Sequence, residues 1–297
     1  MRRIVSVALG AFAVVLASAA AATAGASAPR AWIIFSANPA GQNIEQLFRI
    51  HPAGDGIQQI TMGAYSSIAP AFSPNGQRIA FARLGVGILT MNIDGTGLRR
   101  LTTNGRDSFP AWSPDGAHIA FIRPYKAEWR VNTMSSSGAA ERRLRQAPPS
   151  GRPTWTAAGL LIPSGGALLK VDPTTGHVQK YYGADIDAVW GENSVALSPD
   201  RSRLTFVGAR NAEPGDKECG EGPCPRFALY QENLLKTKKP VRVVKDTGPA
   251  TFSPGGTQLA FVANGGLVLW SLASATPTTL TTGDVTPTVS APPAWQR

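Results

Sequence analysis

The sequence predicts an all-β fold in which six four-stranded blades are closed into a ring, and three observations support it. One motif recurs along the chain at a nearly constant spacing. Each copy is followed by a second hairpin pattern, so one repeat supplies four strands. The two ends of the chain carry complementary halves of the motif. A repeat of about 40 to 45 residues with four strands is typical of a β-propeller blade.

Four copies of the motif are complete, and two are partial. The complete copies are PAFSPNGQRIAF (70–81), PAWSPDGAHIAF (110–121), VALSPDRSRLTF (195–206) and ATFSPGGTQLAF (250–261). PTWTAAGLLI (153–162) keeps the aromatic residue but has a shorter turn, and PAWQR (293–297) stops inside the motif. Only one interval between neighbouring copies, 55 residues long, falls outside the 40 to 43 residues of the others. The repeat therefore extends over the whole chain after its N-terminal segment.

Each motif has a mechanical interpretation as a strand, a turn and a second strand. Ser-Pro favours extended backbone, and Asn75-Gly76 or Asp115-Gly116 would supply the positive φ angles of a tight hairpin turn. A further hairpin follows, for example GILTMNIDGTGLRRLT (87–102). The aromatic or leucine residue of the motif should pack between adjacent blades, at Phe72, Trp112, Trp155, Leu197, Phe252 and Trp295.

The ends predict how the ring closes. The chain has AWIIFSAN (31–38), a second-strand pattern without its first strand, and ends with a first-strand pattern at 293–296. We expect the C-terminal strand to join the N-terminal blade, which removes the exposed edges of an open array.

The repeats PxWSPDGxxIAF in a chain with an export signal resemble the WD40-like repeats of TolB-like β-propellers. The resemblance covers about residues 31 to 297 and implies a single TolB-like β-propeller domain at 25–297. Related propellers serve as binding modules, peptidase gates and polysaccharide lyases, so the resemblance predicts the fold better than the activity. It also implies a loop face, with the connections between blades and between second and third strands, and a turn face, with the tight hairpin turns.

The first 24 residues are typical of a signal peptide. Arg2 and Arg3 provide the positive start, an apolar stretch follows, and Ala22-Thr23-Ala24 is a small-residue cleavage site. We expect an exported protein, periplasmic or extracellular, that does not span a membrane after cleavage. An uncleaved membrane anchor is the alternative. The formal net charge of +10 falls to +8 without Arg2 and Arg3. Outside the cytoplasm, such an excess favours envelope polyanions over nucleic acid, or it is a plain soluble surface.

The two cysteines, Cys219 and Cys224, predict a local disulfide, because an exported chain with one close pair usually oxidises it. They lie in the insertion GARNAEPGDKECGEGPCPRF (208–227), which accounts for the 55-residue interval and should project from the loop face between the second and third strands of blade five.

The sequence predicts no catalytic residues and no resident cofactor. His51, His118 and His177 fall near tight turns of different blades, and no G-x-S-x-G motif precedes a hydrolase domain. Six acidic residues fall in the connections between blades and form a calcium hypothesis, because hard cations bind several carboxylate oxygens. They are Asp107, Asp185, Asp187, Glu192, Asp246 and Asp284. Such residues also commonly bond their own backbone.

The predicted function is a monomeric, non-catalytic extracytoplasmic binding scaffold whose partner, a protein or an envelope polyanion, docks on the loop face. Two alternatives remain open: a carbohydrate-active enzyme of the polysaccharide-lyase type and a sensor subunit. A cluster of histidines and carboxylates at the channel would favour the enzyme, whereas an exposed apolar patch on the loop face would favour a protein partner.

Overall fold

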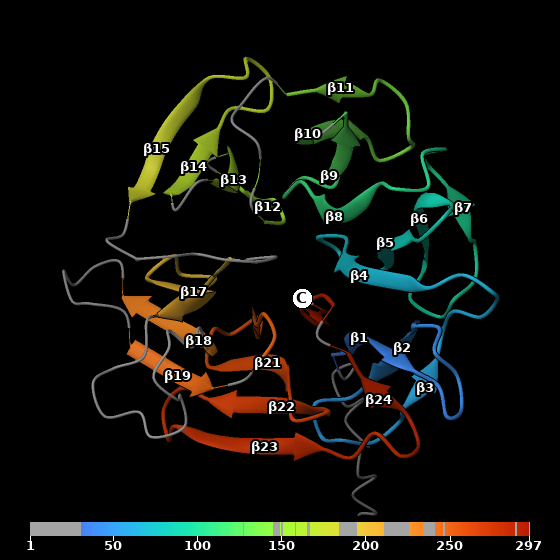
Figure 1. Ribbon diagram of the computed structural model, residues 1–297, viewed down its shortest axis with the longest axis vertical. Helices are drawn as coiled ribbons and strands as arrows, with labels where there is room; N and C mark the ends of the chain where they lie inside the picture. Colours follow the sequence, from blue (N-terminus) through green and yellow to red (C-terminus); the bar gives the residue numbers. More distant parts are fainter. Residues whose placement is uncertain are drawn as a thin grey trace, which may run out of the picture. The chain divides into compact units, whose positions relative to one another are not determined.

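The protein folds as an all-β propeller, in which strands wind from the channel outward and each sheet packs on its two neighbours (Figure 1). The computed structural model describes residues 31–126, 128–144, 149, 151–157, 159–164, 167–183, 195–210, 226–233, 241–245, 247–288 and 290–296. Ala31–Arg297 forms one compact unit. The described strands form six antiparallel sheets, five with four strands and one with five.

The first three sheets follow one another along the chain. Sheet 1 contains β1 (Ile33–Asn38), β2 (Gln46–Ile50), β3 (Gln58–Gln59), β24 (Thr286–Pro287) and β25 (Ala294–Trp295). Sheet 2 contains β4 (Ser67–Phe72), β5 (Arg78–Arg83), β6 (Gly87–Asn92) and β7 (Arg99–Arg100). Sheet 3 contains β8 (Ser108–Trp112), β9 (His118–Tyr125), β10 (Glu128–Ser135) and β11 (Arg142–Arg143).

The other three sheets repeat the same order of strands. Sheet 4 contains β12 (Thr154–Thr156), β13 (Gly159–Ser164), β14 (Ala167–Val171) and β15 (Val178–Gly183). Sheet 5 contains β16 (Ala196–Leu197), β17 (Arg203–Arg210), β18 (Arg226–Asn233) and β19 (Val241–Lys245). Sheet 6 contains β20 (Thr251–Phe252), β21 (Gln258–Ala263), β22 (Gly266–Ser271) and β23 (Thr276–Leu280). As predicted, the insertion joins the second strand of sheet 5 to the third.

The predicted pairing of the two ends is present in sheet 1. Ile33 of β1 faces Trp295 of β25, and Ala37 of β1 faces Pro287 of β24. Gln296 extends the contact, because its backbone N–H donates to the Trp32 carbonyl at 2.8 Å and its side-chain oxygen accepts from the Trp32 N–H at 3.0 Å. Its side-chain amide also donates to the carbonyl of Gly76 in the turn of sheet 2 at 2.9 Å. The C-terminal segment thus links sheets 1 and 2.

The core consists of hydrophobic clusters between neighbouring sheets. Each cluster combines residues of two consecutive sheets, and sheets 6 and 1 share the cluster that contains Ile33, Leu267 and Trp295. The predicted packing of the motif's large apolar residues is confirmed, because each lies in or against a different cluster. They are Phe72, Trp112, Trp155, Leu197, Phe252 and Trp295. Burial at the interfaces, rather than in one centre, lets a chain of this length fold as one unit.

The serine of the motif builds the turn between the first two strands. Ser73 Oγ accepts the Arg78 N–H at 2.9 Å and donates to Asn75 Oδ1 at 2.7 Å. The prediction that both Asn75 and Gly76 have positive φ was wrong, because only Gly76 does, at 68°. The loop is longer than a two-residue hairpin: Gly76 N–H bonds the Ser73 carbonyl, and the strands resume at Arg78. Asparagine serves as an acceptor here instead of adopting left-handed backbone.

The equivalent turn in sheet 5 should make the stability of the fold depend on pH. Hydrogen bonds from Ser198, the strongest influence, and from Ser202 lower the pKa of Asp200 to about 2, from 3.8. Because the folded-state pKa is lowered, this carboxylate stabilises the fold above pH about 3.8, and the contribution disappears as the pH falls toward 2. We expect Ser198→Ala to raise the Asp200 pKa toward 3.8, as measured by NMR titration of the carboxyl group, and to flatten the loss of thermal stability between pH 4 and 2.

Ser253→Ala is a matched control for this prediction, because the equivalent turn of sheet 6 has Gly255 in the place of Asp200. That variant loses the same serine but has no carboxylate in the turn to titrate. If Ser253→Ala flattens the acid transition as much as Ser198→Ala does, the carboxylate is not the cause.

Arginines tie the outer parts of consecutive sheets together. Arg99 of β7 donates to the Ser137 carbonyl in the next sheet at 3.0 Å, and Arg142 of β11 donates in the same way to the Thr174 carbonyl. Arg49 of β2 bonds the Ile93 carbonyl of sheet 2 at 2.9 Å. The acceptors all lie in the turn between the third and fourth strands of the following sheet. Part of the excess positive charge therefore belongs to arginines that hold neighbouring sheets together.

Candidate functional site

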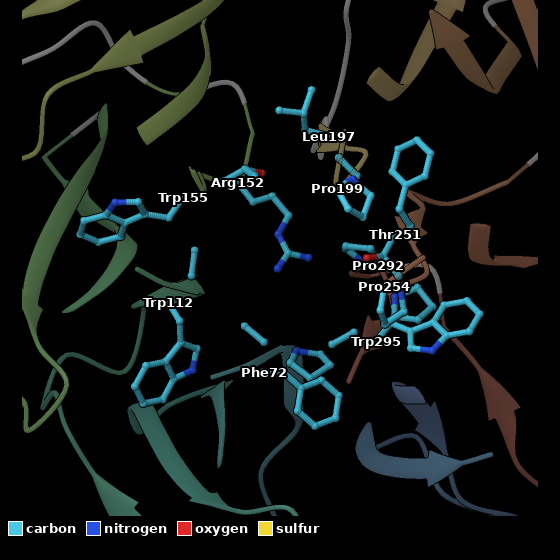
Figure 2. A pocket seen from close by; sticks show the side chains of 18 of the residues that line it. Phe72, Trp112, Arg152, Trp155, Leu197, Pro199, Thr251, Pro254, Pro292 and Trp295 are labelled. Atoms are coloured by element: carbon cyan, nitrogen blue, oxygen red, sulfur yellow. The ribbon is translucent and has the colours of Figure 1, made fainter. Parts of the chain in front are cut away.

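The central channel holds a cavity of about 210 Å³ that is lined by the innermost strands of every sheet (Figure 2). Its walls are mainly proline, alanine, serine, threonine and large apolar residues. The prolines come from both ends of the inner strands, for example Pro70, Pro114 and Pro254. The side chains of Phe72, Trp112, Trp155 and Trp295 are directed away from the middle, toward the interfaces between sheets. The cavity wall is thus mostly backbone and small side chains.

Arg152 is the charged residue among the described residues that line this cavity. It precedes β12, in the connection from sheet 3, and its guanidinium reaches into the cavity (Figure 2). Its pKa is lowered to about 10 because burial disfavours the charged form. Half-buried by surface area, the side chain makes no hydrogen bond or ion pair with a described residue. It stays protonated at neutral pH.

The structure describes two of the six acidic residues in the calcium hypothesis. Asp107 is fully buried and binds Arg123 through both carboxylate oxygens, at 2.6 and 2.7 Å. Asp284 is exposed. Asp185, Asp187, Glu192 and Asp246 lie outside the described residues, as do the cysteine pair and the signal segment. In the described part of the chain no group of three His, Cys, Asp or Glu side chains could hold a metal ion. The calcium site stays a prediction.

Near the loop face, Arg123 binds two carboxylates, those of Asp107 and Glu141, and we call these three residues the polar link. Besides Asp107, its guanidinium contacts the Glu141 carboxylate, and the hydrogen bond to Asp107 is the largest cause of its raised pKa. Asp107 lies before β8, Arg123 on β9 and Glu141 before β11. The polar link joins the connection from sheet 2 to β9 and to the segment before β11 of sheet 3. This pairing supports the connection between the sheets.

The three histidines lie in different sheets, as predicted. His51 follows β2, stacks on Trp32 with ring centroids 3.7 Å apart, and has its Nδ1 3.3 Å from Asp55 Oδ1. His118 begins β9, and His177 lies in the turn before β15. They share the turn face but not a site.

A second cavity, of about 680 Å³, opens on the turn face between sheets 3 and 4. His118, Trp155, Arg142 and Asp172 are among the residues that line it, and the His118 and Trp155 rings are 6.2 Å apart. Hydrogen bonds from the backbone of Thr175 and Thr174 lower the Asp172 pKa. Asp172 therefore caps its own turn, and Arg142 bonds the Thr174 carbonyl. Asp172 and Arg142, two polar groups of this groove, thus have structural partners.

Large apolar side chains are exposed on the loop face of sheets 1 to 3. We call the following five residues the loop-face apolar group: Met62, Tyr65, Leu84, Tyr125 and Trp129, with exposed fractions from 42 to 77%. Tyr65 lies against the backbone of Gly85, next to Leu84. Tyr125 and Trp129 flank the tip of the β9–β10 hairpin, and the Arg143 guanidinium lies 4.6 Å from the Tyr125 ring centre. The sequence analysis missed this group because its members lie outside the repeated motif.

Among the described residues, no helix has the length and apolar character needed to cross a membrane.

No protein-family model matches the sequence. An uncharacterized protein of Agrobacterium fabrum is 30% identical over 112 residues, which are 33% of this chain and 38% of that protein. The chain thus covers well under half of this relative's length.

Two solved structures share the arrangement of sheets over most of the chain. TolB from Acinetobacter baumannii aligns with a TM-score of 0.68 and 15% identity over 90% of this chain and 66% of that one. A chain of a nidogen/laminin complex aligns with a TM-score of 0.66 and 10% identity over 90% of this chain and 98% of that one. At such identities the likeness concerns the fold alone. The expected resemblance is confirmed at that level: the chain is structurally similar to TolB β-propellers.

Proposed function

We propose that the six sheets are the six blades of one closed ring, and that the ring is a non-catalytic, exported scaffold that binds a partner protein on its loop face. Sheets 6 and 1 share a hydrophobic cluster just as the other consecutive sheets do, which supports closure. Export and cleavage near Gly25 rest on the N-terminal pattern. The Cys219–Cys224 disulfide remains part of the proposal.

The loop-face apolar group is the observation that carries this proposal. Isolated exposed apolar residues are common on proteins, but Tyr and Trp are enriched at protein interfaces and dominate their binding energy. Here Tyr65, Tyr125 and Trp129 all lie on the face that carries the connections between sheets. None of them packs between sheets, because the aromatic residues of the motif fill those interfaces. We infer that these side chains are exposed because they contact the surface of a partner protein.

Charge favours a protein partner with acidic residues around an apolar centre. Arg106 and Lys126 are exposed in loop-face connections, and exposed Arg143 lies against Tyr125. Without Arg2 and Arg3 of the signal segment, the formal charge of the chain is +8. An anionic polymer would use the cations but would leave the apolar side chains unpaired, so the combination fits an acidic protein better.

We expect a photo-crosslinking residue placed at Tyr65 or Trp129 in the native host to capture one main protein. Purified, that protein should bind the parent chain and lose about 100-fold or more in affinity with the Tyr125→Ala, Trp129→Ala double variant, measured by calorimetry, because aromatic anchors of this kind each contribute about 2 kcal/mol or more. Binding should also weaken as salt rises.

The matched control is the double variant Ile57→Ala, Leu98→Ala, whose residues are 39 and 51% exposed on the turn face. It should bind as tightly as the parent. Equal capture from position 98, a crosslinked second copy of the chain, capture of an anionic polymer, or unchanged affinity in the aromatic variant would each overturn a protein partner on the loop face.

A further inference from the structure

Arg152 is not required by the blade repeat. It occupies the position directly before the first residue of the motif. The equivalent positions hold Ala69 in sheet 2, Phe109 in sheet 3, Ser194 in sheet 5, and Pro249 and Pro292 in sheets 6 and 1. The other copies of the motif therefore have an uncharged residue at this place. An arginine in sheet 4 needs another explanation.

No described residue compensates the charge of Arg152. Apart from Arg152 itself, the described residues that line the cavity are uncharged. The serine, threonine and backbone groups of the walls are neutral, and burial accounts for the lowered pKa of the guanidinium. Other arginines of comparable burial have partners: Arg123 binds Asp107, and Arg78 donates to Thr90 Oγ1 at 2.7 Å. A partly desolvated cation without a partner is costly, and an anion from outside would remove this cost.

We propose that the central cavity binds a carboxylate group, with the Arg152 guanidinium as its partner. The planar guanidinium matches a planar carboxylate through two parallel N–H···O bonds. A single negative charge balances the single positive charge at the site, whereas a phosphate dianion would leave one negative charge uncompensated in a partly buried cavity. The cavity of about 210 Å³ accommodates a small organic group next to the carboxylate. The site goes beyond the proposed function and does not depend on it.

Two sources could supply the carboxylate, a small organic acid or an acidic side chain of a protein. Arg152 lies in a connection between sheets, at the loop-face end of β12, so both sources would approach from that face. The recognition chemistry is the same for both, and the size of the group attached to the carboxylate distinguishes them.

Benzoate and its neutral isostere benzamide test the site directly on the full exported chain. We expect benzoate at about 100 times its Kd to raise the melting temperature by roughly 5 °C or more, and benzamide to have little effect. Arg152→Gln should reduce benzoate affinity at least tenfold in calorimetry. Its own melting temperature without ligand should equal or exceed that of the parent, because an unpaired charge is removed.

Arg106→Gln is the matched control, since Arg106 is an exposed arginine in another connection between sheets and does not line the cavity. It should bind benzoate like the parent. Arg152→Lys keeps the charge but loses the two-pronged geometry, so it should lose affinity too, and it serves as the second variant if Arg152→Gln does not fold. Equal shifts from benzoate and benzamide, or unchanged benzoate affinity in a folded Arg152 variant, would overturn the proposal.

A blocked, glycine-rich peptide with one glutamate separates the two sources. If it displaces benzoate, the site accepts a protein side chain. If it does not, while benzoate still binds through Arg152, the ligand is a small acid. Either result supports carboxylate binding, and neither depends on the loop-face apolar group, since no partner protein is present in the assay.

Discussion

Replacing Trp295 by alanine is expected to lower the free energy of unfolding by about 3–5 kcal/mol, which is the usual cost of removing a large buried aromatic side chain. Trp295 is 8% exposed and packs with Ile33 and Leu267 between sheets 1 and 6. Its strand holds the C-terminal end against β1. The loss therefore combines a cavity with a weakened junction between the ends of the ring. Denaturation in guanidinium, followed by tryptophan fluorescence and circular dichroism, measures it.

Trp129→Ala is the control, because Trp129 is 44% exposed at a hairpin tip. Exposed substitutions of this kind usually change stability by less than about 0.5 kcal/mol. A loss of less than about 1 kcal/mol in Trp295→Ala would mean that β25 adds little to the ring, and the proposed closure would then fail.

Replacing Asp107 by alanine should cost about 3 kcal/mol or more, because it leaves Arg123 with a desolvated charge and one remaining carboxylate partner. Asp107 is fully buried, and two charge-assisted bonds hold it to Arg123. Glu141→Ala should cost about 1 kcal/mol or less, since that carboxylate is much more exposed. Equilibrium unfolding of both variants at pH 7 makes the comparison.

A double-mutant cycle separates the ion pair from simple packing. Arg123→Met combined with Asp107→Ala should cost less than the sum of the two single losses, because the double variant leaves no buried charge unpaired. If the two losses add, the residues are not coupled, and the assigned role of the pair is wrong.

The repeat made the architecture predictable from the sequence. Its period indicated four strands per unit, the Ser-Pro-Asn-Gly segment placed the first turn, and the half motifs at the ends indicated the pairing of β25 with β1. These features are local or periodic, so neighbouring residues carry the information. Even the hydroxyl of Ser73, which bonds Asn75 inside the turn and Arg78 at its end, acts within five residues.

Features that depend on distant contacts or on side-chain direction could not be predicted. Ala69 and Phe109 have φ of 53° and 52°, at matching register shifts in β4 and β8, although neither is glycine. In each strand the left-handed residue accompanies the register shift. Likewise, the partner of Asp107 lies 16 residues away on another strand. Nothing in the sequence around Arg152 indicates that its side chain points into the channel.

The arginines that tie consecutive sheets together also affect how the protein responds to salt. Arg99 and Arg142 donate to backbone carbonyls, not to carboxylates. Dissolved ions screen attraction between opposite charges, but these bonds involve one charge and a neutral dipole. Higher ionic strength should therefore leave the ties largely intact while it reduces repulsion among the many arginines. We therefore expect the sheets of this basic propeller to stay together at high ionic strength at least as well as in dilute buffer.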